Sequence, residues 1–139
     1  MDFTLVGVAF AASDPAASAR WFAEHFGFTV TVDLGWYVSL HHESHTGLSV
    51  DLVHRDHESW PDGARGREVA GTLFALMVAD VDAEHERLRT EGVAVLRPPV
   101  TEPWGQRRCQ LAGPDGLVVE ILQRVAPDPA WLAANGFGA

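Results

Sequence analysis

The chain has 139 residues, of which 47% are hydrophobic and 21% charged, and its formal net charge is −9. This length fits one domain that buries a core of its own, and the apolar content excludes a disordered chain. No run approaches the roughly 18 apolar residues that a membrane span needs. All ten basic residues are Arg and 19 residues are acidic, so the charge opposes binding to nucleic acid or to an anionic membrane surface.

The start of the sequence and its cysteine content indicate the compartment. No basic segment followed by an apolar run opens the chain, so no secretory signal is visible. The lone Cys109 cannot form a disulfide within the chain, which suits a reducing environment. We therefore expect a cytoplasmic protein in which Cys109 is a packed thiol rather than a nucleophile.

The first half of the chain predicts a strand, a helix and three further strands. Asp14-Pro15 combines an N-cap residue with a proline at the first helical position, and Gly27 stands where a C′ glycine ends a helix. Apolar, partly β-branched runs separated by turn residues predict the strands. The expected elements are a strand over 3–10, a helix over 15–26, and strands over 28–33, 36–41 and 47–54.

The second half repeats this order. A strand over 72–78 precedes a helix that Asp80 caps and Gly92 ends; strands over 93–97, 106–112 and 117–124 and a short helix over 129–134 follow. Segments 47–53 and 116–122 are the most similar parts of the two halves. Both follow a turn, and both carry a carboxylate, Asp51 or Glu120, at their fifth position. An internal repeat of this kind predicts an α+β fold of two tandem βαβββ modules.

The same pattern predicts how the chain is organised. We expect a first βαβββ module at 1–55, a polar connector at 56–69, a second βαβββ module at 70–125 and a C-terminal tail helix at 126–139. Together they form one structural domain.

Several motifs in this repeat resemble the vicinal oxygen chelate superfamily, the glyoxalase, bleomycin-resistance and extradiol dioxygenase group. The motifs are Asp14-Pro15 followed by Trp21-Phe22 and Phe26-Gly27-Phe28, then Val78-Ala79-Asp80-Val81-Asp82-Ala83, Pro103-Trp104-Gly105 and Gly113-Pro114-Asp115-Gly116. The resemblance covers about residues 3–124. It implies that two modules form a cup-shaped mixed sheet around one site, with the helices outside, in a homodimer whose modules pair either within one chain or between the subunits.

The resemblance also implies where a divalent metal would bind. Metal-binding members use His on the first strand of a module, seven residues before the capping Asp, and an acidic residue on the last strand. The first-strand positions here are Gly7 and Leu73, which cannot bind a metal through their side chains, and the last-strand positions are Asp51 and Glu120. Two carboxylates alone would hold a divalent ion weakly. The sequence therefore resembles the metal-free, bleomycin-resistance-like branch, with no cofactor expected and a divalent metal as the alternative.

Strand alternation places the same positions on one face of each predicted sheet. Small residues there leave room, and the carboxylates stand at fixed points among apolar neighbours, as in a pocket for a bulky, largely apolar or cationic small molecule. In the alternative interpretation, the carboxylates lie at solvated strand ends or pair with Arg107, Arg108 or Arg124. The candidate ligand-binding residues are Gly7, Ala9, Trp36, Asp51, Trp60, Leu73, Ala75, Trp104 and Glu120.

The five tryptophans and a histidine-rich segment are further candidates for ligand or metal contacts. Trp36, Trp60 and Trp104 are candidates for stacking on a planar ligand, whereas the other two Trp residues are expected to be structural. The segment 41–45, which holds three His, falls at a predicted turn. Because adjacent strand residues point to opposite faces, we interpret it as a solvated hairpin rather than a metal site.

Two functions compete for this site. The first is a non-catalytic binding protein that sequesters an antibiotic or related natural product, giving drug resistance or self-protection; no catalytic residue is then needed. The second is a glyoxalase-like lyase, isomerase or dioxygenase in which Glu120 acts as general base. A small-molecule sensor is a third reading, although no effector domain fits within this chain.

Overall fold

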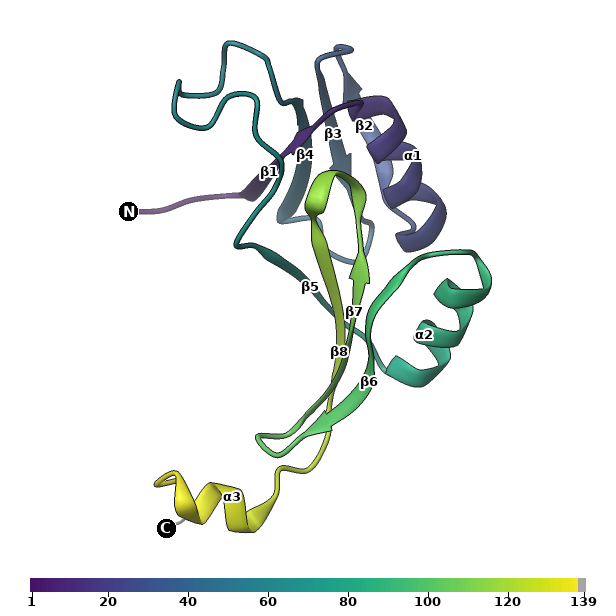
Figure 1. The fold of residues 1–139 in the computed structure, drawn as a ribbon. Helices are drawn as coiled ribbons and strands as arrows, with labels where there is room; N and C mark the ends of the chain where they lie inside the picture. Colours follow the sequence, from purple (N-terminus) through teal and green to yellow (C-terminus); the bar gives the residue numbers. More distant parts are fainter. Residues whose placement is uncertain (138–139) are drawn as a thin grey trace. The chain divides into compact units, whose positions relative to one another are not determined.

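The computed structural model describes residues 1–137, which form two four-stranded sheets with helices beside them (Figure 1). The chain divides into two compact units: the first comprises Met1–Gly71 and Pro114–Leu117, and the second comprises Thr72–Gly113 and Val118–Ala139. The elements of the first module are β1 (Val6–Ala12), α1 (Pro15–Phe26), β2 (Thr29–Asp33), β3 (Tyr37–His41) and β4 (Leu48–His54). Those that follow are β5 (Leu73–Met77), α2 (Val81–Thr90), β6 (Val95–Glu102), β7 (Gln106–Ala112), the 3₁₀ turn η1 (Pro114–Gly116), β8 (Val118–Arg124) and α3 (Pro129–Ala134).

In the first unit the strand order is β1-β4-β3-β2, with β1 parallel to β4 and the remaining pairs antiparallel. Helix α1 packs against this sheet. The Asp14 carboxylate accepts a hydrogen bond from the Ala17 N–H at 2.9 Å, and Gly27 ends the helix with a φ of 71°. Both ends of the helix therefore follow the cap signals of the sequence.

The second unit repeats this architecture. Its strand order is β5-β8-β7-β6, with β5 parallel to β8, and α2 packs against the sheet. The Asp80 carboxylate accepts from the Ala83 N–H at 3.0 Å, as Asp14 does in the first unit. The predicted α+β fold of two tandem βαβββ modules is confirmed.

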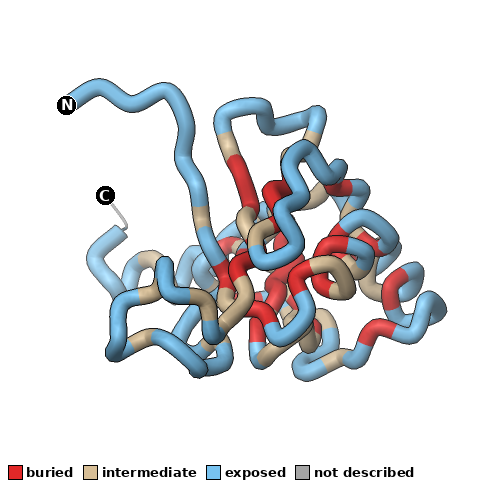
Figure 2. The backbone as a smooth tube through the Cα atoms, turned by 90° about the horizontal axis from the view of Figure 1, so that it is seen from above, coloured by how far each residue is buried: buried red, intermediate tan, exposed pale blue. Residues whose placement is uncertain are grey.

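Each sheet buries the face that its helix covers. Val50 and Leu52 of β4, and Val119 and Ile121 of β8, are almost completely buried, and buried stretches run through the strands and helices in Figure 2. Because side chains alternate along a strand, the residues between them project from the opposite face of each sheet. That face carries the six candidate site residues that lie on strands, and the three candidate tryptophans lie outside the strands.

The boundaries of two predicted strands were wrong, and the first of these strands ends at Ala12 rather than at position 10. The first strand begins at Val6 rather than at position 3, because its partner β4 begins at Leu48 and leaves the residues before Val6 unpaired; they are exposed in Figure 2. Strand β6 covers Val95–Glu102 instead of 93–97. It runs through Pro98-Pro99 because it is an edge strand, where a missing N–H removes no necessary ladder bond.

The turn between β7 and β8 belongs to the first unit. Asp115 adopts a φ of 53°, its carboxylate accepts from the Ser13 N–H at 3.0 Å, and its carbonyl accepts from the Val69 N–H at 3.0 Å. Gly116 has a φ of 83°, and a Cβ on it would lie 2.8 Å from the Val69 carbonyl oxygen. The Pro-Asp-Gly motif is therefore a docking turn as well as a hairpin turn.

The tail helix α3 packs in the second unit next to the β6–β7 turn. The Asp128 N–H donates to the Pro103 carbonyl, and the Val125 N–H donates to the Gly105 carbonyl. The last two positions of the predicted tail, 138–139, lie outside the described residues. No helix in the described part of the chain is long and apolar enough to cross a membrane.

Candidate functional site

The two carboxylates singled out by the repeat occupy equivalent places in the two sheets. Asp51 of β4 lies between Ala9 of β1 and Ser39 of β3 in the strand register. Glu120 of β8 lies between Ala75 of β5 and Gln110 of β7. Both carboxylates therefore stand on the strand next to the parallel edge strand, opposite an alanine. The surroundings of the two carboxylates differ.

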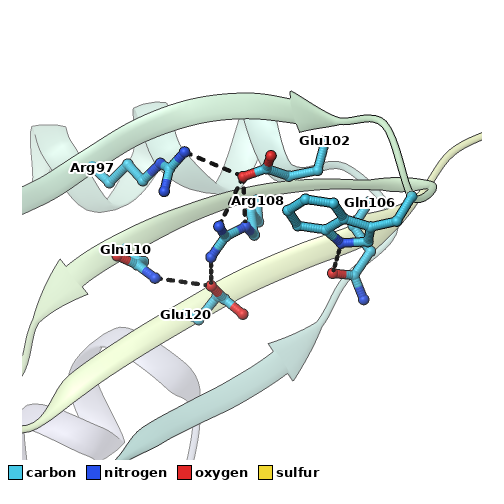
Figure 3. A network of polar contacts seen from close by, with 7 residues as sticks. Arg97, Glu102, Gln106, Arg108, Gln110 and Glu120 are labelled. Atoms are coloured by element: carbon cyan, nitrogen blue, oxygen red, sulfur yellow. Dashed lines mark hydrogen bonds and ion pairs between the residues drawn. The ribbon is translucent and has the colours of Figure 1, made fainter. Parts of the chain in front are cut away.

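Glu120 is part of a network of ion pairs in the second unit (Figure 3). Its Oε1 accepts from Arg108 Nη1 at 2.7 Å and from Gln110 Nε2 at 3.1 Å. Arg108 also donates to Glu102 Oε1, through Nε at 2.9 Å and Nη2 at 2.8 Å. Arg97 donates to the same oxygen of Glu102 at 3.2 Å. The two carboxylates are thus bridged by one guanidinium, and two positive charges match two negative charges.

Burial makes this network strong. Glu102 and Glu120 are each only 8% exposed, so their charges depend on protein donors more than on water. The hydrogen bond that Arg108 donates to Glu120 raises the pKa of Arg108, and the bond that it donates to Glu102 raises this pKa further against the opposing effect of burial. The interpretation in which Glu120 pairs with an Arg, left open by the sequence, holds for Arg108.

Trp104 borders this network on the side of the β6–β7 turn. The Arg108 guanidinium lies 5.6 Å from the centroid of its ring, within the range of a cation–π contact. The indole N–H of Trp104 donates to Gln106 Oε1 at 2.9 Å, which fixes the plane of the ring. Trp131 of α3 lies 6.3 Å from Trp104, and Phe137 stacks on Trp131 at 6.1 Å. Aromatic residues of the turn and the tail therefore form one exposed cluster, with Trp104 41% exposed.

Asp51 has a simpler environment in the first unit. Its Oδ1 accepts from the Ser39 hydroxyl at 2.7 Å, and no ion pair involves it within residues 1–137. Gly7 lies beside it: a Cβ on Gly7 would be 3.8 Å from Asp51 Oδ2 and 2.9 Å from the Ser49 hydroxyl. Asp51 is half-buried, whereas Gly7 and Ala9 are exposed. This carboxylate therefore accepts one neutral hydrogen bond and has no positive partner in the part of the chain that the structure describes.

The other two candidate tryptophans of the first unit lie near the connector. Trp36 stacks on His57 with a centroid distance of 3.7 Å and an angle of 5° between the rings. The Trp60 indole N–H donates to the His54 carbonyl at 3.2 Å, which ties the connector to the end of β4. One face of Trp36 is therefore already covered by an imidazole.

The structure distributes the predicted site residues between the two units. The first unit holds Gly7, Ala9, Trp36, Asp51 and Trp60, and the second holds Leu73, Ala75, Trp104 and Glu120. Within its own unit, Asp51 lies with Gly7 and Ala9, and Glu120 lies with Ala75. Contact with a ligand stays a prediction for all nine.

Sequence reasoning missed part of the environment of both carboxylates. Glu102 was outside every predicted strand because β6 was expected to end at 97, and Gln110 and Ser39 were not considered. The signal was available for Gln110 and Arg108, because antiparallel pairing of β7 with β8 places both on the face of Glu120.

Cys109 is buried as expected, and burial raises the pKa of its thiol, so it is held as a neutral packed group.

The residues at the family's metal positions do not fit a divalent ion. Gly7 and Leu73 bring no donor side chain, and Glu120 Oε1 is taken by Arg108 and Gln110. Among the described residues no group of three or more His, Cys, Asp or Glu is arranged to hold a metal. These residues therefore do not make up the metal site that the resemblance implied, and a metal-free protein stays a prediction.

The fold is a tandem pair of βαβββ modules, and the last strand of each module carries an acidic residue. The family model of the glyoxalase/bleomycin resistance protein/dioxygenase superfamily matches residues 4–121, and the chain belongs to this superfamily. No curated protein matches the sequence significantly.

Solved structures share this fold. A glyoxalase/bleomycin resistance protein/dioxygenase from Nocardioides has a TM-score of 0.74 at 22% identity, with 93% of this chain and 89% of that chain covered. TnmS3, an antibiotic binding protein from Streptomyces sp. CB03234, has a TM-score of 0.70 at 25% identity, over 88% and 97%. A protein described as oxidase ChaP-H2 has a TM-score of 0.65 at 25% identity, over 92% and 98%. The superfamily thus supplies both a binding protein and an enzyme as structural relatives.

Proposed function

We propose that this protein binds an antibiotic or related natural product without converting it, and protects the cell by sequestration in the cytoplasm. The observation that carries the proposal is the engagement of Glu120 by Arg108 and Gln110. A general base needs a lone pair aimed at the substrate proton, whereas this carboxylate is held in a compensated ion-pair network. The likeness to the antibiotic binding protein TnmS3 supports the same function.

The surface chemistry also supports a bulky, largely apolar ligand. Leu73 and Met77 of the edge strand β5 are about half exposed on the face that carries Glu120. Trp104 and the aromatic cluster of the tail offer flat rings next to this face. Such exposed apolar groups beside a few fixed polar groups are typical of a ligand-binding surface.

The test is binding without turnover. The purified protein is titrated by calorimetry with one glycopeptide-type metal chelator, one mitomycin-like quinone and one enediyne, and each mixture is then analysed by mass spectrometry. We expect one of these classes to bind at a fixed stoichiometry and to be recovered with unchanged mass. Failure of all three classes to bind would contradict the proposal.

The alternative is a lyase, isomerase or dioxygenase with Glu120 as general base. The likeness to oxidase ChaP-H2 favours it. In this case the same mass spectra contain a product, and Glu120→Gln abolishes product formation while ligand binding persists. Without a product in the wild type, the enzyme hypothesis is wrong for the compounds tested.

A homodimer is part of the proposal. Each sheet ends in edge strands, β1 and β2 or β5 and β6, whose outer backbone groups have no strand partner in the described residues. Exposed apolar side chains on β5 add area that a second copy can cover. Size-exclusion chromatography with light scattering is expected to give twice the mass of the chain.

A further inference from the structure

The equivalent carboxylates of the two units differ in charge compensation. Arg108 lies against Glu120 at 2.7 Å, so the ion pair is complete before any ligand arrives. Asp51 accepts one hydrogen bond, from the neutral Ser39 hydroxyl, and forms no ion pair in the part of the chain that the structure describes. The sheet face of the first unit therefore carries an uncompensated negative charge.

The second oxygen of Asp51 accepts no hydrogen bond among the described residues. Ser39 occupies Oδ1 from β3, and the small residues Gly7 and Ala9 stand on the opposite side, on β1. Even a methyl group on Gly7 would come within 3.8 Å of Oδ2 and collide with the Ser49 hydroxyl at 2.9 Å. In the second unit the position of Gly7 is taken by Leu73. The first unit thus places a small residue where the second unit places Leu73, beside a carboxylate without a positive partner in the described residues.

A ligand that covers this sheet face of the first unit also covers the negative charge of Asp51. An apolar body would take Asp51 out of water, which is costly unless the ligand supplies a donor, and most favourable when that donor is positive. At Glu120 the same covering costs less, because Arg108 already supplies the positive charge. A second cation there would meet Arg108 at close range and be repelled.

We infer that Asp51 binds a protonated amine of the ligand, while Glu120 selects for neutral groups. The inference rests on the proposed function and narrows it to ligands that combine an apolar, planar body with one ammonium group. Asp51 Oδ2 accepts from the ammonium, and Ser39 holds the carboxylate in place through Oδ1. The rest of the ligand lies over the small residues of β1.

Two probes with the same ring system separate charge from shape. 1-Pyrenemethylamine carries an ammonium group at neutral pH, and 1-pyrenemethanol carries a hydroxyl at the same point. Their affinities for the full chain are measured by calorimetry. We expect the amine to bind about tenfold more tightly, since a hydrogen bond between charged groups exceeds a neutral one by roughly that factor. The preference should fall as salt is added.

Variants locate the preference on the surface. Asp51→Asn keeps the shape and the acceptor for Ser39, and is expected to abolish the preference for the amine. Glu120→Gln is expected to retain it. Asp62→Asn removes a charge from an almost fully exposed acid of the same unit, so it controls for the general attraction of amines by a chain of net charge −9. Circular dichroism verifies that each variant is folded.

The outcomes judge the inference separately from the proposed function. Equal affinities for the two probes, or a preference that survives Asp51→Asn, overturn the inference and leave the binding of neutral natural products intact. A preference lost only in Glu120→Gln overturns it as well. If both probes bind more weakly than about 1 mM, Asp51 is not an ammonium site, and the proposed function is judged by the three antibiotic classes instead.

Discussion

The two units of this protein share a sheet topology and differ in their electrostatics. The second unit carries ion pairs on both faces of its sheet, through Arg108 on one and through Arg107 with Asp82 of α2 on the other. In the first unit, Arg65 forms an ion pair with Asp62, which lies in the connector rather than on the sheet. The same strand order thus supports a compensated sheet and an uncompensated one. The repeated fold places Asp51 and Glu120 at equivalent positions. The side chains of the adjacent strand, β3 or β7, determine whether the carboxylate already has a positive partner.

The largest effect is expected from removing the shared guanidinium. Arg108→Met leaves Glu102 and Glu120 buried without their bridging cation, and we expect a loss of about 3 kcal/mol in the free energy of unfolding. Urea denaturation measures it. Arg97→Met serves as control, because that side chain is 45% exposed and should cost less than about 1 kcal/mol. Equal losses would show that burial does not distinguish the two arginines.

The next test compares the two carboxylates directly. Glu120→Gln weakens charge-assisted hydrogen bonds in a buried site, and we expect a loss of about 2 kcal/mol. Asp51→Asn keeps an oxygen for Ser39 and removes no ion pair, so the expected loss is below about 1 kcal/mol. The same denaturation experiment gives both values. A reversed order would contradict the view that only the second unit relies on its carboxylate.

A smaller effect is expected at the first strand of the first unit. Gly7→Ala places a methyl group 2.9 Å from the Ser49 hydroxyl, and we expect a loss of about 1 kcal/mol from the displaced side chain. Ser49→Ala should relieve it, so that the double variant is more stable than the sum of the single changes predicts. Additive losses would mean that the two residues do not meet.

The smallest effect is a pH dependence on the outer face of the second unit. The hydrogen bonds from Arg107, at 2.6 and 2.7 Å, lower the pKa of Asp82 below its ordinary value of 3.8. A lowered pKa stabilises the fold fully above that value, and the stabilisation is lost as pH falls through the folded pKa. The stability difference between wild type and Asp82→Asn should therefore shrink below about pH 4. Glu86→Gln should give a similar pH dependence, because the hydrogen bonds that Arg89 donates to Glu86 within α2 also lower the pKa of that carboxyl.

Much of the fold could be predicted because its signals are local. The capping residues Asp14 and Asp80 and the terminating Gly27 act within one turn of their helices, and the structure uses all three. The strand boundaries that failed depend on partners elsewhere. β1 starts only where β4 begins, and β6 continues past Pro99 as long as β7 pairs with it. Such pairing is not encoded in the strand itself.

The sequence predicted which face of each sheet carries the candidate site, but not which side chains contact each other there. Alternation along β8 placed Glu120 among its neighbours, and the choice of Arg108 over Arg107 follows from the β7–β8 register, which turns Arg107 to the face of Asp82. The register of a hairpin depends on its turn, which the sequence left open. Which oxygen is occupied depends on side-chain rotamers, which no sequence pattern specifies.

The turn at Pro114–Leu117 has a consequence for recombination between members of this superfamily. Its chain neighbours on both sides belong to the second unit, yet Asp115 accepts the N–H groups of Ser13 and Val69 in the first. A crossover at position 71 therefore gives the first module a foreign acceptor for two of its backbone donors. Chimeras should fold best when the incoming second half brings an Asp-Gly turn of the same geometry.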